Sequence, residues 1–436
     1  MTSHRKPGRV RWGVLLRIAV PAIVLLGAGT ATAATAEESD ALARADKKSR
    51  RARWSAKRIT TITEFGKSVD WSARDNMIVS ARRRMDGYYD VFKMRPDGNG
   101  FAFLTGDGDG HPQRHNGNPA WNPDKPYIVF TAENQDSPLT PDLERYAYPG
   151  SGIGHDLWVM NSDGTQFHRL TAYALTPPLR SVIHPQVSND GEKVAWAERV
   201  ARGQSFGGGW VMKLADFVEG TSGAAPRLEN TLTLKPVEKS CFYETHDFSP
   251  DDKRLLFSGD LQPGQPHVGL DIYELNLQNQ TLKRLTDSDE AWDEHAHYSP
   301  DGTSIAWMSS QGLNVQYGST EGFDWADYLK TELWIMNADG SGKQQLTHFN
   351  TPGYPEYMGG ARCIVSDSSW SPDGTRLVAC VAWFSGSRAG VKLMMVEVGR
   401  TNERSADGGT DAFGPCSLQA FPIGLSALGA WRLARR

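Results

Sequence analysis

Two histidines stand one residue apart in the segment DEHAHYSPDG, residues 293–302. His295 and His297 follow Asp293 and Glu294, so imidazole nitrogens and carboxylate oxygens, both common ligands of divalent metal ions, lie close together in the chain. Side chains two residues apart on a β-strand point to the same face, so a strand here would present both imidazoles together. The segment indicates a metal centre if other ligands converge on it; the alternative is two histidines bonded to water or backbone.

Two further histidines precede similar turns. When the segments are aligned on Ser299, His184 takes the position of His295, whereas His246 is offset by one residue and faces either a channel or the interface between repeats. Asp247 adds a carboxylate beside His246. The candidate ligands of one divalent ion, manganese or calcium with zinc as a further alternative, are His184, His246, His295 and His297.

A second group of polar residues lies on HPQRHNGNPAW, residues 111–121. Its side chains suit a sugar or a carboxylate, although a loop rich in glycine, asparagine and proline also satisfies its own turns in this way. Trp292 offers a ring that stacks on a sugar or peptide, and Glu294 lies two residues further along. The candidate ligand-binding residues are His111, Arg114, His115, Asn116, Asn118, Trp292 and Glu294.

These residues belong to one repeated unit. Each copy has a strand, a tight turn built on Asp and often Gly, and a second strand in which apolar and polar residues alternate, as in HPQVSNDGEKVAWAE (184–198) and HAHYSPDGTSIAWMS (295–309). Between the copies lies a second strand pair, as in ELWIMNADGSGKQQLT (332–347). The period of two residues excludes a helical solenoid and predicts four-stranded sheets. The copies begin at residues 68, 118, 184, 245, 295 and 367.

Sheets repeated in this way are typical of a β-propeller, in which each blade covers the next. We predict an all-β, six-bladed propeller of four-stranded blades over residues 56–399, with seven blades as the alternative. The sixth unit has three strands, and AKRITTI (56–62) matches the outer strand LKRLTDS (282–288). The N-terminal strand is expected to pair into the last blade, which closes the ring and removes a free edge.

The order of the four strands, named A to D from the axis outward, predicts which face holds the site. The A–B and C–D turns are short, whereas the D–A and B–C connections hold long insertions such as GDGDGHPQRHNG and ENQDSPLTPDLERYAYPGSGIGH. Functional loops collect on the elaborated face of a rigid scaffold. The site is therefore expected among the D–A and B–C connections.

The segments WSPDGTRLVA and ELWIMNADGSGKQQLT resemble the repeats of TolB-family propellers over about residues 56–399. That resemblance implies an exported propeller, here without the α/β domain that precedes the propeller of TolB. HAHYSPDG resembles the His-x-His of oligogalacturonate lyases, which implies a divalent metal, manganese in known members, held near the axis by three histidines and a glutamine. His246 would be the third histidine, and Trp292 stands where the glutamine is expected and cannot ligate.

Charge and the N-terminal segment limit the location and the partners. With 47 Lys and Arg against 51 Asp and Glu in 436 residues, the chain has no general attraction for nucleic acid, and no segment indicates a nucleotide site. A basic start, an apolar stretch and small residues predict a signal peptide over residues 1–36, followed by a basic linker at 37–55. We expect a secreted or periplasmic monomer, attached to a membrane only if the signal segment stays uncleaved.

Four cysteines follow the predicted signal peptide, and an exported protein can oxidise them. Three full pairings are available, and the sequence does not choose among them. Residues 400–436 match no repeat and are predicted to form a poorly structured tail. The cysteines are Cys241, Cys363, Cys380 and Cys416.

Two functions fit these observations. The favoured one is a non-catalytic scaffold that binds a protein or a glycan on the face with the long loops, so no catalytic residue is assigned. The alternative is a metal-dependent lyase that cleaves acidic polysaccharides at uronates by β-elimination, with His246, His295 and His297 on the metal. Its base is not assigned, because Arg114, Arg180 and Arg362 all lie on suitable loops.

Overall fold

The computed structural model describes residues 52–402, apart from residues 138, 140–143, 145, 174–179, 201–208, 221–222, 289 and 316–326. The predicted signal peptide (1–36), residues 37–51 of the predicted linker, and residues 403–436 of the predicted tail, with Cys416, lie outside the described residues. None of the helices in the described ranges is long and apolar enough to cross a lipid bilayer.

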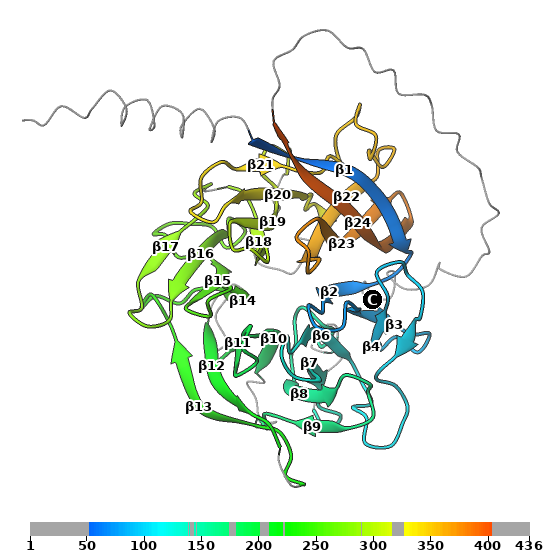
Figure 1. Ribbon diagram of the computed structural model, residues 1–436, viewed down its shortest axis with the longest axis vertical. Helices are drawn as coiled ribbons and strands as arrows, with labels where there is room; N and C mark the ends of the chain where they lie inside the picture. The colour runs from blue at the N-terminus through cyan, green and yellow to red at the C-terminus, as the bar shows by residue number, and fades with distance from the viewer. Residues whose placement is uncertain are drawn as a thin grey trace, which may run out of the picture. The chain divides into compact units, whose positions relative to one another are not determined.

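The described strands form six four-stranded antiparallel sheets, set around an axis as the blades of a propeller, so the predicted fold is confirmed (Figure 1). From the axis outward, blade 1 consists of β2 (Lys67–Trp71), β3 (Ile78–Arg83), β4 (Tyr89–Met94) and β5 (Ala102–Phe103). Blade 2 consists of β6 (Asn116–Trp121), β7 (Tyr127–Glu133), β8 (His155–Asn161) and β9 (Phe167–Arg169). Blade 3 consists of β10 (Ser181–Val187), β11 (Lys193–Arg199), β12 (Trp210–Val218) and β13 (Arg227–Leu234). Blade 4 consists of β14 (Tyr243–Phe248), β15 (Arg254–Gly259), β16 (Asp271–Asn276) and β17 (Leu282–Arg284). Blade 5 consists of β18 (Asp293–Tyr298), β19 (Ser304–Ser309), β20 (Glu332–Asn337) and β21 (Gln344–Gln345). Blade 6 consists of β22 (Arg362–Trp370), β23 (Arg376–Ser385), β24 (Arg388–Asn402) and β1 (Ala52–Thr63).

The N-terminal strand β1 completes blade 6 by pairing antiparallel with β24, which confirms the predicted closure of the ring. Ile59 lies opposite Val396 in this ladder. The strand begins at Ala52, inside the segment predicted as linker, and β24 runs to Asn402, beyond the predicted end at residue 399. Both strands are longer than predicted because these two ends face each other and supply each other's backbone partners.

The Ser-Pro-Asp-Gly segments form the A–B turns because their side chains satisfy the turn's own backbone. In blade 5, the Ser299 hydroxyl donates to Asp301 at 2.6 Å and accepts the backbone N–H of Ser304 at 3.0 Å. Gly302 has a φ of +67°, a conformation that costs glycine little. These turns fix where each inner strand ends.

Neighbouring blades are held together by apolar cores and by a few inner-strand carboxylates. Each core joins residues of two adjacent blades, and Trp71 and Trp121 are buried in this way. Asp70 of blade 1 accepts the backbone N–H of Trp121 in blade 2 at 2.7 Å. Asp367 of blade 6 accepts that of Val69 in blade 1 at 2.9 Å, across the point where the ring closes.

Each inner strand is irregular at one level, close to the axis. A β-bulge places an extra residue on the inner strand and turns its side chains. At this level Ser68, Asn118, His184 and His295 have φ of 50°, 46°, 47° and 53°, a conformation sparsely populated by residues with a side chain. The register shifts lie at Lys67/Val69, Gly117/Ala120, Ile183/Gln186, Thr245/Asp247, Glu294/His297 and Val365/Asp367.

The described cysteines are free thiols. Cys241, Cys363 and Cys380 are all buried, and none is paired with another. Burial is the largest cause that raises their pKa values, to about 11, about 12 and about 11 respectively. They behave as small apolar core residues rather than as disulfide staples or reactive thiols.

Candidate functional site

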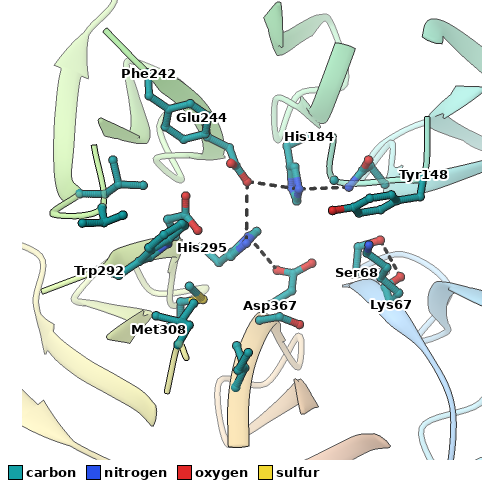
Figure 2. A pocket seen from close by; sticks show the side chains of 18 of the residues that line it. Lys67, Ser68, Tyr148, His184, Phe242, Glu244, Trp292, His295, Met308 and Asp367 are labelled. Atoms are coloured by element: carbon teal, nitrogen blue, oxygen red, sulfur yellow. Dashed lines mark hydrogen bonds and ion pairs between the residues drawn. The ribbon is translucent and has the colours of Figure 1, made fainter. Parts of the chain in front are cut away.

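A cavity of about 150 Å³ lies where the inner strands meet, and it opens among the long connections (Figure 2). Tyr148 reaches it from the B–C connection of blade 2 and His267 from that of blade 4. Phe242 and Trp292 come from the D–A connections that precede blades 4 and 5. These are the two sets of connections among which the sequence predicts the site.

Three ligand-type side chains converge on one side of this cavity, and we call His184, Glu244 and His295 the hub cluster (Figure 2). The Glu244 Oε1 atom lies 3.2 Å from His184 Nε2 and 3.7 Å from His295 Nε2. The three side chains come from β10, β14 and β18, the inner strands of three consecutive blades. The residues are 9%, 5% and 9% exposed, so nearly all of their surface faces other protein atoms or the cavity.

The spacing of the hub cluster suits a metal ion. Its three ligand atoms lie within 4.8 Å of one another. Ligands bound at about 2.1 Å in a tetrahedral arrangement are about 3.4 Å apart, close to the two distances from Glu244. A cation between these atoms would need little movement of these three side chains, but it would have to replace the Asn118 amide at His184 Nε2.

Two further residues contact the imidazoles of the hub cluster. Asp367 Oδ1 lies 3.7 Å from His295 Nδ1, on the side of the ring away from Glu244. A carboxylate behind a ligating histidine fixes the ring and makes its other nitrogen a better ligand. The Asn118 amide nitrogen lies 3.1 Å from His184 Nε2, the atom that would bind the ion, so a bound cation would displace this amide.

Burial shifts the hub cluster toward uncharged forms. It lowers the pKa of His184 to about 3, together with the charge of His295, and lowers the pKa of His295 to about 4. Burial also raises the pKa of Glu244 well above its ordinary value, and the negative charges of Glu294 and Asp367 add to this. A divalent cation reverses this preference, because it supplies the charge that stabilises a carboxylate.

The other two predicted metal ligands lie outside the hub cluster. His246 is turned into the interface between blades 4 and 5, where its Nε2 lies 2.6 Å from the Ser258 hydroxyl and accepts the backbone N–H of His295. His297 lies 3.5 Å from Asp367. Burial alone would lower the pKa of His297, but the hydrogen bond to Asp367 and nearby carboxylates raise it. Each of these imidazoles has its own protein partner.

The predicted group on residues 111–121 is dispersed. Arg114 forms an ion pair with Glu133 at 2.7 Å, and the Asn116 amide donates to Asp90 and to two backbone carbonyls. His111 packs on a phenylalanine ring, and His115 lies against two tyrosines. Of the five candidates, Asn118 is the one that lines the cavity.

The predicted residues Trp292 and Glu294 both line the cavity, and each has a protein partner. Burial is the largest cause that raises the pKa of Glu294 to about 8, although a hydrogen bond with Trp292 opposes it. The candidate arginines face other partners: Arg114 pairs with Glu133, Arg180 with Glu198, and Arg362 donates to the Leu329 carbonyl at 2.8 Å.

Buried histidines predict how stability depends on pH. Burial lowers the pKa of His155 to about 4 and that of His115 to about 3. Below pH ~6.5 the unfolded chain takes up protons that the folded chain refuses, so the free energy of unfolding falls as the pH falls. From pH 7 to pH 5 we expect a loss of about 2 kcal/mol for each of these histidines, measured by urea unfolding.

The variant His155→Gln isolates one of these contributions. It should reduce the difference in unfolding free energy between pH 7 and pH 5 by about 2 kcal/mol. His168→Gln, on the outer strand β9, is the matched control for the loss of one imidazole. An unchanged pH dependence in His155→Gln would show that His155 takes up a proton as readily in the folded protein as in the unfolded chain.

Sequence reasoning missed Glu244, Asp367, Lys67 and Tyr148 as residues of this cavity. One signal was present for Glu244: aligned on the turn, it matches Glu294, which the sequence does select. In blade 4 the next residue, Thr245, bonds back to the His184 carbonyl, and Glu244 provides the side chain that approaches the two histidines.

No family model matches the chain. Among solved structures it is similar to TolB from Acinetobacter baumannii, with 15% identity, a TM-score of 0.43, and coverage of 78% of this chain and 66% of that one. It is also similar to a putative TolB from Agrobacterium tumefaciens (15% identity, TM-score 0.46, 77% and 99% covered). A third similar structure is an oligogalacturonate lyase in complex with manganese (10% identity, TM-score 0.43, 80% and 97% covered). These similarities concern the propeller fold.

Proposed function

We propose that this propeller binds one divalent transition-metal ion in its hub cluster and uses the adjoining cavity to bind an oxygen-rich ligand, a glycan, without converting it. The observation that carries the proposal is the convergence of three ligand atoms beside a cavity among the long loops. A cavity of about 150 Å³ accepts the end of a sugar chain rather than a folded protein surface.

The donor atoms favour manganese or zinc over calcium. Two of the three ligands are imidazole nitrogens, whereas calcium takes six to eight oxygen ligands. Three protein ligands leave coordination positions for water or for an oxygen atom of the bound ligand. A sugar hydroxyl or a carboxylate is suited to such a position.

The walls of the cavity suit a sugar ring. Phe242, Trp292 and Tyr148 place aromatic rings around the polar hub cluster (Figure 2). Ligand sites combine apolar walls with a few convergent polar groups, and aromatic faces accept the C–H surface of a sugar. The metal would fix the polar end of the ligand, and the rings would bury the rest.

The pair His267 and Asp260 favours a second candidate function, a metal-dependent lyase that cleaves acidic polysaccharides. His267 lines the cavity, and its Nδ1 lies 2.5 Å from Asp260 Oδ2, so Nδ1–H donates to the carboxylate and Nε2 keeps its lone pair. A metal in the hub would supply positive charge that acidifies the proton next to a uronate carboxylate. His267 would accept that proton, the electron pair would form a C=C bond, and the bond to the leaving sugar oxygen would break.

One pair of measurements separates the two functions. We expect one Mn²⁺ or Zn²⁺ per chain after dialysis against the ion, measured by elemental analysis. During incubation of the loaded protein with oligogalacturonate, unchanged ultraviolet absorbance supports the binding protein. A steady rise from unsaturated uronates, lost in His267→Gln, supports the lyase. Metal at less than a tenth of the chain concentration would contradict both.

We further propose that the protein acts as a monomer outside the cytoplasm, in the envelope or the medium. The basic and apolar N-terminal sequence supports export. Fractionation of the cells that produce the full chain tests the location: export places the mature protein, shortened by about 33 to 36 residues, outside the cytoplasm. A full-length cytoplasmic protein would contradict it.

A further inference from the structure

We propose that Lys67 recognises a carboxylate of the ligand, so that the ligand of this propeller is an organic acid held between the hub cluster and the Lys67 ammonium group. This inference rests on the metal-assisted binding proposed above, and it names the chemical class of the ligand.

Lys67 lines the cavity beside two tyrosine rings. It begins β2, lines the same cavity as the hub cluster, and lies with Tyr148 in Figure 2. Its Nζ is 4.2 Å from the centre of the Tyr148 ring and 5.5 Å from that of Tyr89. The preceding residue, Gly66, packs so closely that a Cβ there would lie 2.5 Å from Leu393. The close packing of Gly66 therefore fixes the backbone position from which the Lys67 side chain extends.

Lys67 lacks a counter-ion in the part of the chain that the structure describes. Among the described residues that line the cavity, it is the one Lys or Arg. Burial lowers its pKa to about 8, and no carboxylate contributes to raising it. The tyrosine faces attract the ammonium group but carry no negative charge. A partly buried cation without an anion favours a ligand that brings one.

The carboxylates that already line the cavity have other partners. Glu244 belongs to the hub cluster, and Asp367 lies between His295 and His297. Glu294 shares a hydrogen bond with Trp292. None of these described carboxylates is placed to balance Lys67, which favours a bound ligand as the source of the anion.

The hub cluster and Lys67 line the same cavity, and they reach it from the inner strands of different blades. A ligand with a carboxylate and a nearby hydroxyl offers oxygens to both ends at once. Such α-hydroxy and sugar acids are the class that this arrangement fits, since an ammonium group and a metal both bind oxygen anions.

Calorimetry of the Mn²⁺-loaded wild-type protein tests the inference without a variant. We expect glucuronate to bind at least about tenfold more tightly than glucose, because one charge-assisted hydrogen bond is worth that much. Lactate has a carboxylate and an adjacent hydroxyl but no sugar ring, so it distinguishes a small organic acid from an acidic glycan as the ligand. Lactate binding as tightly as glucuronate indicates a small organic acid, and weaker binding indicates an acidic glycan. Equal affinity for glucuronate and glucose would overturn the inference.

Two variants assign the effect to Lys67. Lys67→Met should remove the preference for glucuronate over glucose and leave the bound Mn²⁺ at one per chain, whereas Lys67→Arg should keep most of the preference. A preference unchanged in a folded Lys67→Met protein would overturn the assignment. The metal content keeps the two proposals apart: wild-type protein that binds no metal contradicts the proposed function, and metal-loaded protein without an acid preference contradicts this inference alone.

Discussion

Replacing Glu244 with glutamine is expected to weaken the binding of Mn²⁺ or Zn²⁺ by at least about 100-fold, which corresponds to roughly 3 kcal/mol. Glu244 is the member of the hub cluster that approaches both histidines, at 3.2 Å and 3.7 Å. An amide oxygen of nearly the same shape carries no charge, so two neutral imidazoles would hold the cation alone. Titration calorimetry with each ion measures the change directly.

The matched control for this variant is Glu294→Gln. Glu294 lines the same cavity but lies outside the hub cluster, and its raised pKa already keeps it mostly protonated at neutral pH. We expect its metal affinity to stay within about threefold of that of the parent. A Glu244→Gln protein that binds the ion as tightly as Glu294→Gln would show that the hub cluster is not the metal site.

Thermal unfolding gives an independent readout of the same variants. A ligand that binds only the folded chain stabilises it in proportion to the logarithm of its concentration over its Kd. At a metal concentration 100 times the Kd, we expect about 2.7 kcal/mol of stabilisation for the parent and for Glu294→Gln. Glu244→Gln, at the same metal concentration, should gain less than about 0.5 kcal/mol.

Proline at position 59 is expected to lower the free energy of unfolding by about 2 kcal/mol or more, from backbone strain and weakened strand pairing. Ile59 lies in β1 opposite Val396, and its side chain packs against the core between blades 5 and 6. Proline has no backbone N–H and fixes φ near −65°, which departs from the extended φ of an antiparallel strand. Because β1 alone closes the last blade, its loss would leave β24 as an unpaired edge.

Ile59→Val is the control for the packing part of this effect. It keeps the backbone donor and most of the apolar surface, so we expect a loss of only about 1 kcal/mol. Urea unfolding of the two variants and the parent makes the comparison. Equal stability of Ile59→Pro and Ile59→Val would contradict a structural role for the pairing between β1 and β24.

The fold could be predicted from the sequence because its local signals repeat and agree. The turn around Ser299 recurs in every blade, and the alternation on either side fixes a pair of strands. The closure was predictable from the match of AKRITTI to an outer strand. The ends of β1 and β24 could not be predicted, because Ala52 and Asn402 pair with each other and no local sequence pattern marks either end.

The site could be predicted only in part because β-bulges interrupt the period of two. The alignment placed His184 and His295 at equivalent positions, and these two histidines do meet. Beyond a bulge, the direction of a side chain no longer follows from its place in the strand, so His246 turns into a blade interface while Glu244 approaches the histidines. The positions of loop side chains such as Arg114 were still harder to predict, because the sequence repeat does not indicate which residue each of them contacts.

The pairing of Ala52 with Asn402 has a mechanical consequence. The two ends of the propeller leave blade 6 side by side, so tension applied through them would pull β1 away from β24 one hydrogen bond after another. Strands loaded in this way separate at low force, whereas strands pulled along their length must break many bonds together. Stretching a single molecule by these two points should therefore open the ring at this seam first, with blades 1 to 5 still folded.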